Sequence, residues 1–127
     1  MWELLQRIKP NSRDPLIVMG DFNEALWQFE HFSATRRGEK QMEEFRNSLD
    51  FCGLKDIGFS GLPWTYDNNR GGNSNVKVRL DRAVGDSAWS LLFDQAEVRH
   101  LVSPCSDHCL ILLQLYKERH VKGKHKI

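Results

Sequence analysis

The sequence predicts an α/β fold, in which strands and helices share one domain. Residues 16–19 are four consecutive apolar residues between a proline and a glycine, as in a strand that is buried on both faces. Residues 38–51 carry apolar side chains at helical spacing. Residues 76–81 and 96–102 alternate apolar and polar side chains, which is typical of half-buried strands. Together these patterns predict strands and helices within one domain.

The chain begins with a segment whose apolar residues have the spacing of one helical face. These residues are Trp2, Leu4, Leu5 and Ile8. Residues 9–12 contain a proline, an asparagine and a serine, which end the predicted helix.

Two polar side chains follow the predicted strand at 16–19. Asp21 and Asn23 would lie at its C-terminal end, where open α/β sheets bind ligands. In extended backbone, side chains two residues apart point the same way, so one phosphate or one water could contact both. The alternative is an Asx turn, because Gly, Asp and Asn are common turn residues.

The next segment, 24–37, has the composition of a loop, and its Glu30 and His31 are more typical of exposed loop residues than of ligands. The helix predicted over 38–51 is the clearest element. The helical spacing predicts that Met42, Phe45 and Leu49 pack in the core. Because helices often end at a glycine, Gly53 would be the C-terminal cap.

A short strand is predicted at 54–57, followed by turns and by a polar loop at 67–75. Strands on both sides of this loop would present a basic and aromatic surface of the kind that grips a phosphate backbone and stacks on bases. In the alternative interpretation, the aromatic residues pack on the sheet of a solvated hairpin. The side chains of this surface are Trp64, Tyr66, Arg70, Lys77 and Arg79.

The last third of the chain supplies one helix and two strands. Asp86 and Ser87 are typical of a helix cap before 88–93. Strands are expected at 96–102 and at 110–113. His100 lies in the first of these, where a structural or exposed role is expected. The three cysteines lack metal-finger spacing, which predicts reduced thiols, with Cys52 in the core.

Length and composition are those of an ordinary globular domain. The 127 residues are 40% hydrophobic and 28% charged, and no apolar run is long enough for a membrane span. From residue 116 onward five Lys and Arg face one Glu, so residues 116–127 carry +4 and residues 1–115 carry −3. We therefore expect a folded unit at 1–115 and a basic, disordered tail at 116–127.

Three short motifs occur in a characteristic order. Gly20-Asp21-Phe22-Asn23, then Arg79-Leu80-Asp81-Arg82, then Ser106-Asp107-His108 resemble the C-terminal half of the endonuclease/exonuclease/phosphatase superfamily. The segment 61–68, with its Trp-Thr-Tyr element, and Trp89 resemble the endonuclease domain of LINE-type, non-LTR retrotransposons more closely. The resemblance implies a DNase I-like fold, of which this chain would be half of a four-layer α/β sandwich. That half would be one mostly antiparallel sheet with flanking helices, and the N-terminal half of the domain would be absent.

The resemblance also implies roles for individual residues. Asp21 would activate or orient the attacking water, and Asn23 would bind the phosphate. His108 would contact the scissile phosphate while Asp81 accepts a hydrogen bond from its other ring nitrogen. Mg²⁺ or Mn²⁺ would be held by Asp107, Asp21 and Asn23. DNA would be contacted by Trp64, Thr65, Arg70, Lys77 and Arg79.

Two functional hypotheses follow from the resemblance. In the first, the chain is a fragment of a Mg²⁺-dependent phosphodiesterase, a DNA endonuclease of the retrotransposon type. In the second, it is a catalytically inactive, truncated remnant that at most binds nucleic acid. The expected partners are DNA and either the missing N-terminal half or a second copy of the chain. No membrane partner is expected. The expected location is intracellular, and nuclear if the protein is functional.

Without the missing half, we expect the inner sheet face to be an exposed apolar patch and the chain to be marginally stable, dimeric or prone to aggregation.

Overall fold

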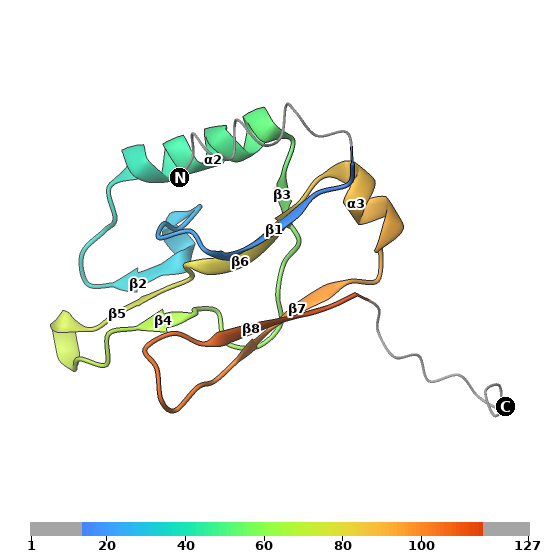
Figure 1. The fold of residues 1–127 in the computed structure, drawn as a ribbon. Helices are drawn as coiled ribbons and strands as arrows, with labels where there is room; N and C mark the ends of the chain where they lie inside the picture. Colours follow the sequence, from blue (N-terminus) through green and yellow to red (C-terminus); the bar gives the residue numbers. More distant parts are fainter. Residues whose placement is uncertain (1–13, 116–127) are drawn as a thin grey trace, which may run out of the picture.

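The computed structural model describes residues 14–115 as an α/β unit built from small antiparallel sheets and two α-helices (Figure 1). The predicted helix at 2–8 and the basic tail at 116–127 lie outside the described residues. No helix within residues 14–115 is long and apolar enough to cross a bilayer.

The strands form three sheets where the sequence analysis expected one. In the first, β6 (Asp81–Gly85) pairs with β1 (Ile17–Asp21) on one side and with β3 (Lys55–Asp56) on the other. In the second, β5 (Val76–Val78) lies between β2 (His31–Ser33) and β4 (Tyr66–Asp67). The third is the pair β7 (Glu97–Leu101) and β8 (Leu110–Gln114). Every one of these strand pairs is antiparallel.

The helix predicted over 38–51 is confirmed as α2 (Glu39–Cys52). Met42 and Phe45 are fully buried, and Leu49 is nearly so, which confirms the predicted core face. The helix ends at Gly53, whose φ of 69° is the left-handed conformation that glycine adopts without strain. Cys52 is buried as predicted, and all three cysteines are free.

The main core lies between α2 and the first sheet. Figure 1 shows α2 on one side of β1 and β6, with the β7–β8 pair on the other side. The buried cluster between α2 and the sheet consists of Phe22, Leu26, Phe45, Leu49, Cys52, Leu54 and Val84. A second cluster, formed by Ala25, Met42 and Val78, joins α2 to the second sheet.

The shorter elements confirm some predictions and correct others. Asp86 caps α3 (Ser87–Leu92) by accepting a hydrogen bond from the backbone N–H of Trp89, as its position predicted. The segment 24–37 is not simply a loop, because it contains a 3₁₀ turn, η2 (Gln28–Glu30), and β2. A second 3₁₀ turn, η3 (Gly72–Ser74), lies in the polar loop before β5.

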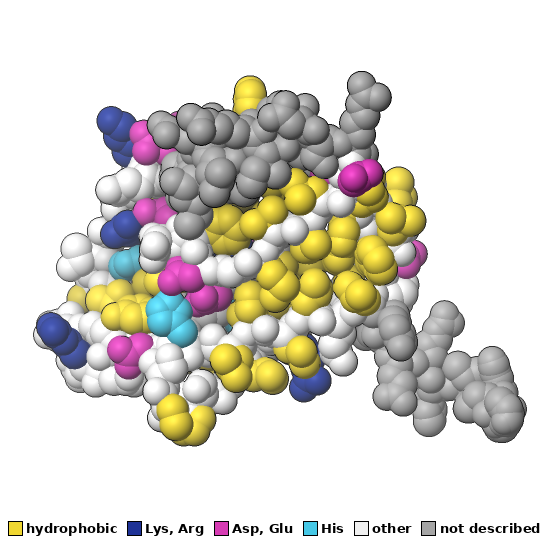
Figure 2. Space-filling model, in the orientation of Figure 1, with side chains coloured by type: hydrophobic (Ala, Val, Ile, Leu, Met, Phe, Trp, Pro, Cys, Tyr) yellow, Lys and Arg dark blue, Asp and Glu magenta, His cyan; other side chains and the backbone are white. Residues whose placement is uncertain are grey.

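The prediction that β1 is buried on both faces is wrong. β1 is an edge strand, and Met19 is 42% exposed. On β8, Leu110 is 62% and Leu112 is 40% exposed. Figure 2 shows hydrophobic side chains gathered over the region of β1, α3 and β8. Met19 on β1 and Leu110 and Leu112 on β8 are therefore exposed apolar side chains that no element within residues 14–115 covers.

The predicted continuous strand through 76–81 is divided in two. The chain leaves β5 after Val78 and enters β6 at Asp81, so it changes pairing partners at residues 79 and 80. Arg79, which alternation placed on the exposed face, is only 4% exposed as a result. This break places Asp81 at the start of a strand that pairs with β1.

Candidate catalytic site

Two carboxylates meet where β1 ends and β6 begins. Asp21 is the last residue of β1, Asp81 is the first residue of β6, and the two are directly opposite one another in the antiparallel register. Side chains of such a pair lie on the same face of the sheet and close together. The side chain of Asp81 is 13% exposed and that of Asp21 is 38% exposed.

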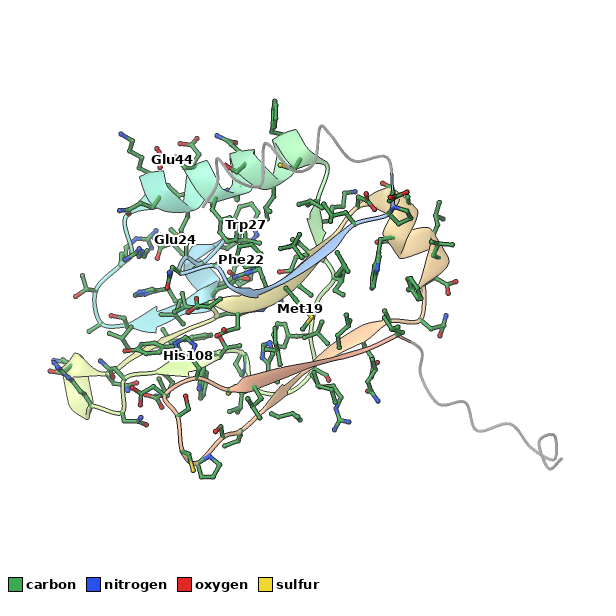
Figure 3. The ribbon with its side chains drawn as sticks, in the orientation of Figure 1. Met19, Phe22, Glu24, Trp27, Glu44 and His108 are labelled. Carbon is green, nitrogen blue, oxygen red and sulfur yellow. The ribbon has the colours of Figure 1, made fainter. Side chains whose placement is uncertain are left out.

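His108 lies between these two carboxylates. Its Nδ1 atom is 2.8 Å from Oδ2 of Asp81, and its Nε2 atom is 3.9 Å from Oδ2 of Asp21. Because a carboxylate only accepts hydrogen bonds, the proton of the first contact belongs to Nδ1 of His108. The second ring nitrogen therefore points to the more exposed carboxylate and to solvent. Figure 3 shows His108 on the side of β6 opposite α2, whereas Phe22 lies on the α2 side.

Contacts with β4 hold the backbone of the His108 segment in place. Tyr66 and His108 form an isolated antiparallel bridge, and their rings lie 5.2 Å apart. The backbone N–H of Cys109 donates to the carbonyl of Thr65, and that of Asp67 donates to the carbonyl of Asp107. The backbone N–H of His108 also donates to Oγ of Ser106. The third motif is thus an extra strand-like segment beside β4.

Asn23 does not extend β1 as the i, i+2 argument assumed. Its φ is +60°, and its backbone N–H donates to Oδ1 of Asp21 at 2.8 Å. This geometry is the Asx turn that the sequence left open as the alternative. It uses one oxygen of Asp21 and leaves the side chain of Asn23 at the surface. There Asn23 lines a cavity of about 170 Å³ together with Tyr66, His31 and Arg37.

Asp107 has different neighbours from the other acidic residues of the site. It is exposed, and its Oδ1 accepts a hydrogen bond from Nδ2 of Asn69 at 3.0 Å. Within residues 14–115, the His, Cys, Asp and Glu ligand atoms that lie within 4.8 Å of one another are those of Asp21, Asp81 and His108. Asp107 does not belong to this group, although its neighbour His108 does. Both line a cavity of about 180 Å³ beside Trp64.

The residues predicted to contact DNA separate into buried and accessible ones. Thr65 is fully buried and Arg79 is 4% exposed, so neither side chain is at a surface that a nucleic acid could touch. Trp64 is half-buried against Phe32, with the ring centroids 5.7 Å apart. Lys77 lies over the ring of Trp64 at 5.2 Å, and Arg70 is exposed in the loop. Trp64 packs against Phe32, as the hairpin interpretation predicts, and its contact with DNA stays a prediction.

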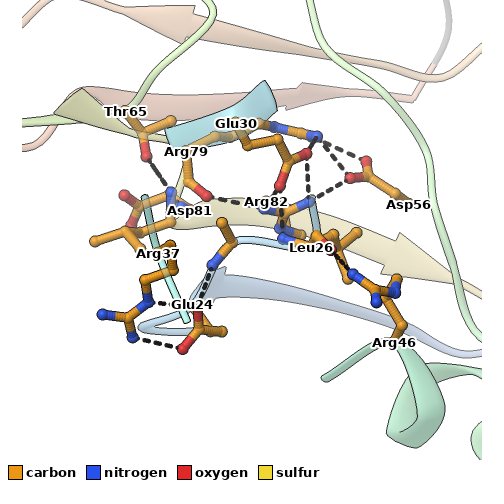
Figure 4. A network of polar contacts seen from close by, with 12 residues as sticks. Glu24, Leu26, Glu30, Arg37, Arg46, Asp56, Thr65, Arg79, Asp81 and Arg82 are labelled. Atoms are coloured by element: carbon orange, nitrogen blue, oxygen red, sulfur yellow. Dashed lines mark hydrogen bonds and ion pairs between the residues drawn. The ribbon is translucent and has the colours of Figure 1, made fainter. Parts of the chain in front are cut away.

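Arg79 belongs instead to a buried network of charges beneath the site (Figure 4). Its guanidinium donates two hydrogen bonds to Asp56, at 2.6 and 2.9 Å, and contacts Glu30 at 3.2 Å. Arg82, which is fully buried, contacts the same two carboxylates at 2.7 Å. Burial raises the pKa of Asp56, but the hydrogen bond from Arg79 and the charges of Arg79 and Arg82 outweigh it and hold the pKa below its usual value.

This network was missed by sequence reasoning, which placed Glu30 in a loop and Arg79 on a surface. Buried Arg and Glu are rare unless paired, and the four partners come from segments that only the fold brings together. Local spacing therefore gave no signal for it. The contact of Tyr66 with His108 was also missed, for the same reason.

The pKa of the Cys109 thiol, near the site, is raised. Burial is the main cause, and the negative charge of Asp81 makes a smaller contribution.

Two comparisons with known proteins bear on this arrangement. A family model described as "Endonuclease/Exonuclease/phosphatase family" matches residues 1–108. The matched range includes all three motifs and ends at His108. No curated protein matches the chain.

Proposed function

The chain belongs to the endonuclease/exonuclease/phosphatase family, and from this premise we propose that it carries part of the catalytic site of a divalent-metal-dependent DNA endonuclease of the retrotransposon type. Membership of this family indicates a hydrolase with phosphodiesterase or nuclease-type activity. The DNA substrate and the retrotransposon type are the finer part of the proposal. The observation that carries it is the placement of His108 between Asp81 and Asp21.

The three side chains of this site suit attack of water on a phosphodiester. Asp81 accepts a hydrogen bond from the Nδ1–H of His108, which fixes the ring orientation and leaves Nε2, when it carries a proton, facing the opposite way. The Nε2 side of the ring can then donate to a phosphate oxygen and stabilise the charge that builds up there. Asp21, 3.9 Å away and more exposed, can orient or deprotonate a water on the same side.

The donor atoms fit a hard divalent cation, because carboxylate oxygens of Asp21 and Asp81 lie within 4.8 Å of one another and of the His108 ring. Such a cation, Mg²⁺ or Mn²⁺, neutralises the charge of the phosphate and polarises a non-bridging oxygen when bound. Asp81 already accepts the hydrogen bond of His108, so Asp21 is the better ligand of the two. We propose that further oxygen ligands come from outside residues 14–115 or from a second chain.

The DNA contact in this proposal rests on the accessible cations and the aromatic ring beside the site. Arg70 and Lys77 are supplied by the loop before β5 and by β5 itself, and Lys77 lies over Trp64. Cations of this kind bind phosphates without regard to sequence.

We also propose that Asp107 is a metal ligand, as the family resemblance implies. To bind the cation, the Asp107 carboxylate would have to give up its hydrogen bond with Asn69.

A non-catalytic nucleic-acid-binding protein is the second candidate. The observation that favours it is the small number of acidic ligands gathered at the site, since Asp107 lies outside the group formed by Asp21, Asp81 and His108. A weakly bound metal would leave DNA binding through Arg70 and Lys77 intact while abolishing cleavage.

A labelled duplex oligonucleotide with Mg²⁺ or Mn²⁺ tests the proposal. We expect metal-dependent cleavage of one strand that leaves a 3′ hydroxyl, shown by direct extension of the product with a DNA polymerase. Cleavage that leaves ends a polymerase cannot extend would contradict the retrotransposon type. DNA binding without cleavage by the folded chain would support the second candidate.

A further inference from the structure

Thr65 is placed by the fold where its side chain can control the Asp81–His108 pair. It is the residue before β4, it is fully buried, and its hydroxyl accepts two hydrogen bonds from consecutive backbone N–H groups. These come from Leu80 at 2.9 Å and from Asp81 at 3.0 Å (Figure 4). Successive N–H groups that converge on one oxygen fix the conformation of the backbone that carries them.

This contact lies where the chain passes from β5 to β6. The N–H of Arg79 donates to the carbonyl of Glu30 and the carbonyl of Leu80 accepts from Phe22, whereas the N–H groups of Leu80 and Asp81 donate to the Thr65 hydroxyl. The Thr65 hydroxyl is the acceptor of these two part-buried N–H groups, and a backbone N–H group away from water is costly without an acceptor. The side chain of Asp81 leaves the backbone at this position, so its direction depends on that anchor.

The backbone of Thr65 also holds the partner of Asp81. The carbonyl of Thr65 accepts from the N–H of Cys109 at 2.6 Å, and the next residue, Tyr66, forms a bridge with His108. Asp81 and His108 are far apart in sequence, yet each is one or two hydrogen bonds from Thr65. The side chain orients the carboxylate and the main chain orients the imidazole.

We propose that Thr65 is a positioning residue, whose hydroxyl keeps the Asp81 carboxylate aligned with Nδ1 of His108. The inference rests on the proposed function for its catalytic meaning but not for its geometry. Thr65→Val keeps the shape and removes the acceptor, whereas Thr65→Ser keeps the acceptor. Neither change touches an atom that faces solvent.

The test is the tautomer of the His108 ring, measured by ¹⁵N NMR at neutral pH in the wild type, Thr65→Val, Thr65→Ser and Asp81→Asn. We expect protonated Nδ1 in the wild type and in Thr65→Ser. In Thr65→Val the signals should shift toward those of Asp81→Asn. Asp86→Ala is the matched control, because Asp86 is also buried and accepts backbone hydrogen bonds, from Leu16 and Trp89. It should lower the melting temperature without changing the ring tautomer.

Activity gives a second readout. If the wild type cleaves DNA, kcat should fall at least 10-fold in Thr65→Val with KM unchanged, and stay within about threefold in Thr65→Ser. If the wild type does not cleave, the proposed function fails and the tautomer still decides the role of Thr65. An unchanged tautomer in folded Thr65→Val, or equal loss in Thr65→Ser, would overturn the proposal.

Hydrogen exchange keeps the proposal testable if Thr65→Val does not fold. The amides of Leu80 and Asp81 should then exchange slowly in the wild type and in Thr65→Ser. Fast exchange of both amides in the folded wild type would overturn the anchoring role.

Discussion

Nδ1 of His108 lies 2.8 Å from Oδ2 of Asp81, although 27 positions of sequence separate the two residues. The contact exists because β6 begins at Asp81 and because the His108 segment pairs with β4. One side of the His108 ring contacts the mostly buried carboxylate of Asp81. The other side faces the more exposed carboxylate of Asp21. In the proposed function, this asymmetry assigns Asp81 to orienting His108 and leaves Asp21 accessible to water and substrate.

Asp81→Asn should keep the fold and lose most of the activity. The amide of Asn can occupy the same space, but it is a weaker acceptor for the Nδ1–H of His108 than a carboxylate is. We expect kcat for DNA cleavage to fall by about 10²–10⁴-fold, which is the usual range for a general acid or base contribution. Cleavage kinetics and a thermal melt check this prediction. Wild-type rates in a well-folded Asp81→Asn protein would remove Asp81 from the mechanism.

Arg82→Met should be strongly destabilising. The change leaves the buried carboxylates of Glu30 and Asp56 with Arg79 as their remaining arginine partner. Breaking a buried ion pair from one side costs about 3–5 kcal/mol. Urea denaturation measures the loss, with Arg99→Met as the control, because Arg99 is exposed on β7 and should change stability by less than about 0.5 kcal/mol. Equal stabilities for the two variants would contradict the structural role of the network.

His100 should make the protein less stable below neutral pH. Burial lowers its pKa below 6.5, while its Nδ1–H donates to the carbonyl of Leu62 at 2.7 Å. The unfolded chain therefore takes up a proton that the folded chain does not, so this contribution to stability is present above pH 6.5 and is lost as the pH falls from 6.5 toward the folded pKa. One such proton corresponds to at most about 1.4 kcal/mol per pH unit.

Denaturation of the wild type and of His100→Asn between pH 7.5 and 5.5 tests this effect. The variant keeps a donor for Leu62 and should show a smaller pH slope. His31, whose pKa is lowered by burial and by Arg37, should maintain part of the slope in both proteins. Identical slopes would show that His100 does not contribute.

The exposed apolar side chains of β1 and β8 should drive self-association. Met19, Leu110 and Leu112 are each at least 40% exposed, and apolar surfaces of this kind tend to associate. Light scattering after gel filtration should show dimers or larger species at micromolar concentration. Leu110→Glu should shift the protein toward the monomer, whereas Phe51→Glu, on α2, should not. A monodisperse wild-type monomer would contradict this prediction.

The sequence predicted those elements whose signal is local. The spacing of Met42, Phe45 and Leu49 predicted the buried face of α2, and Gly53 predicted the residue at which the helix ends. Both predictions are confirmed. The three motifs identified Asp21, Asp81 and His108, and the structure brings these side chains together. Their roles in catalysis remain predictions.

The errors concern features that depend on distant partners. Alternation around Arg79 predicted exposure, but the chain changes pairing partners there and the side chain turns to Asp56. The strand β2 was missed because its stability comes from pairing with β5. Thr65 was assigned to DNA contact from the family resemblance, and only the fold shows that it is buried.

The most direct test of the central claim is nicking of supercoiled plasmid by the purified chain with Mg²⁺. The wild type is compared with the Asp21→Ala, His108→Ala double variant and with Asp94→Ala, which removes an exposed carboxylate in the turn after α3. If these side chains form a working site, the wild type and Asp94→Ala should nick the plasmid and the double variant should lose at least 100-fold in rate. Equal nicking by the double variant, or no nicking by well-folded wild type with either Mg²⁺ or Mn²⁺, would contradict a catalytic role for the Asp21–His108–Asp81 arrangement in this chain.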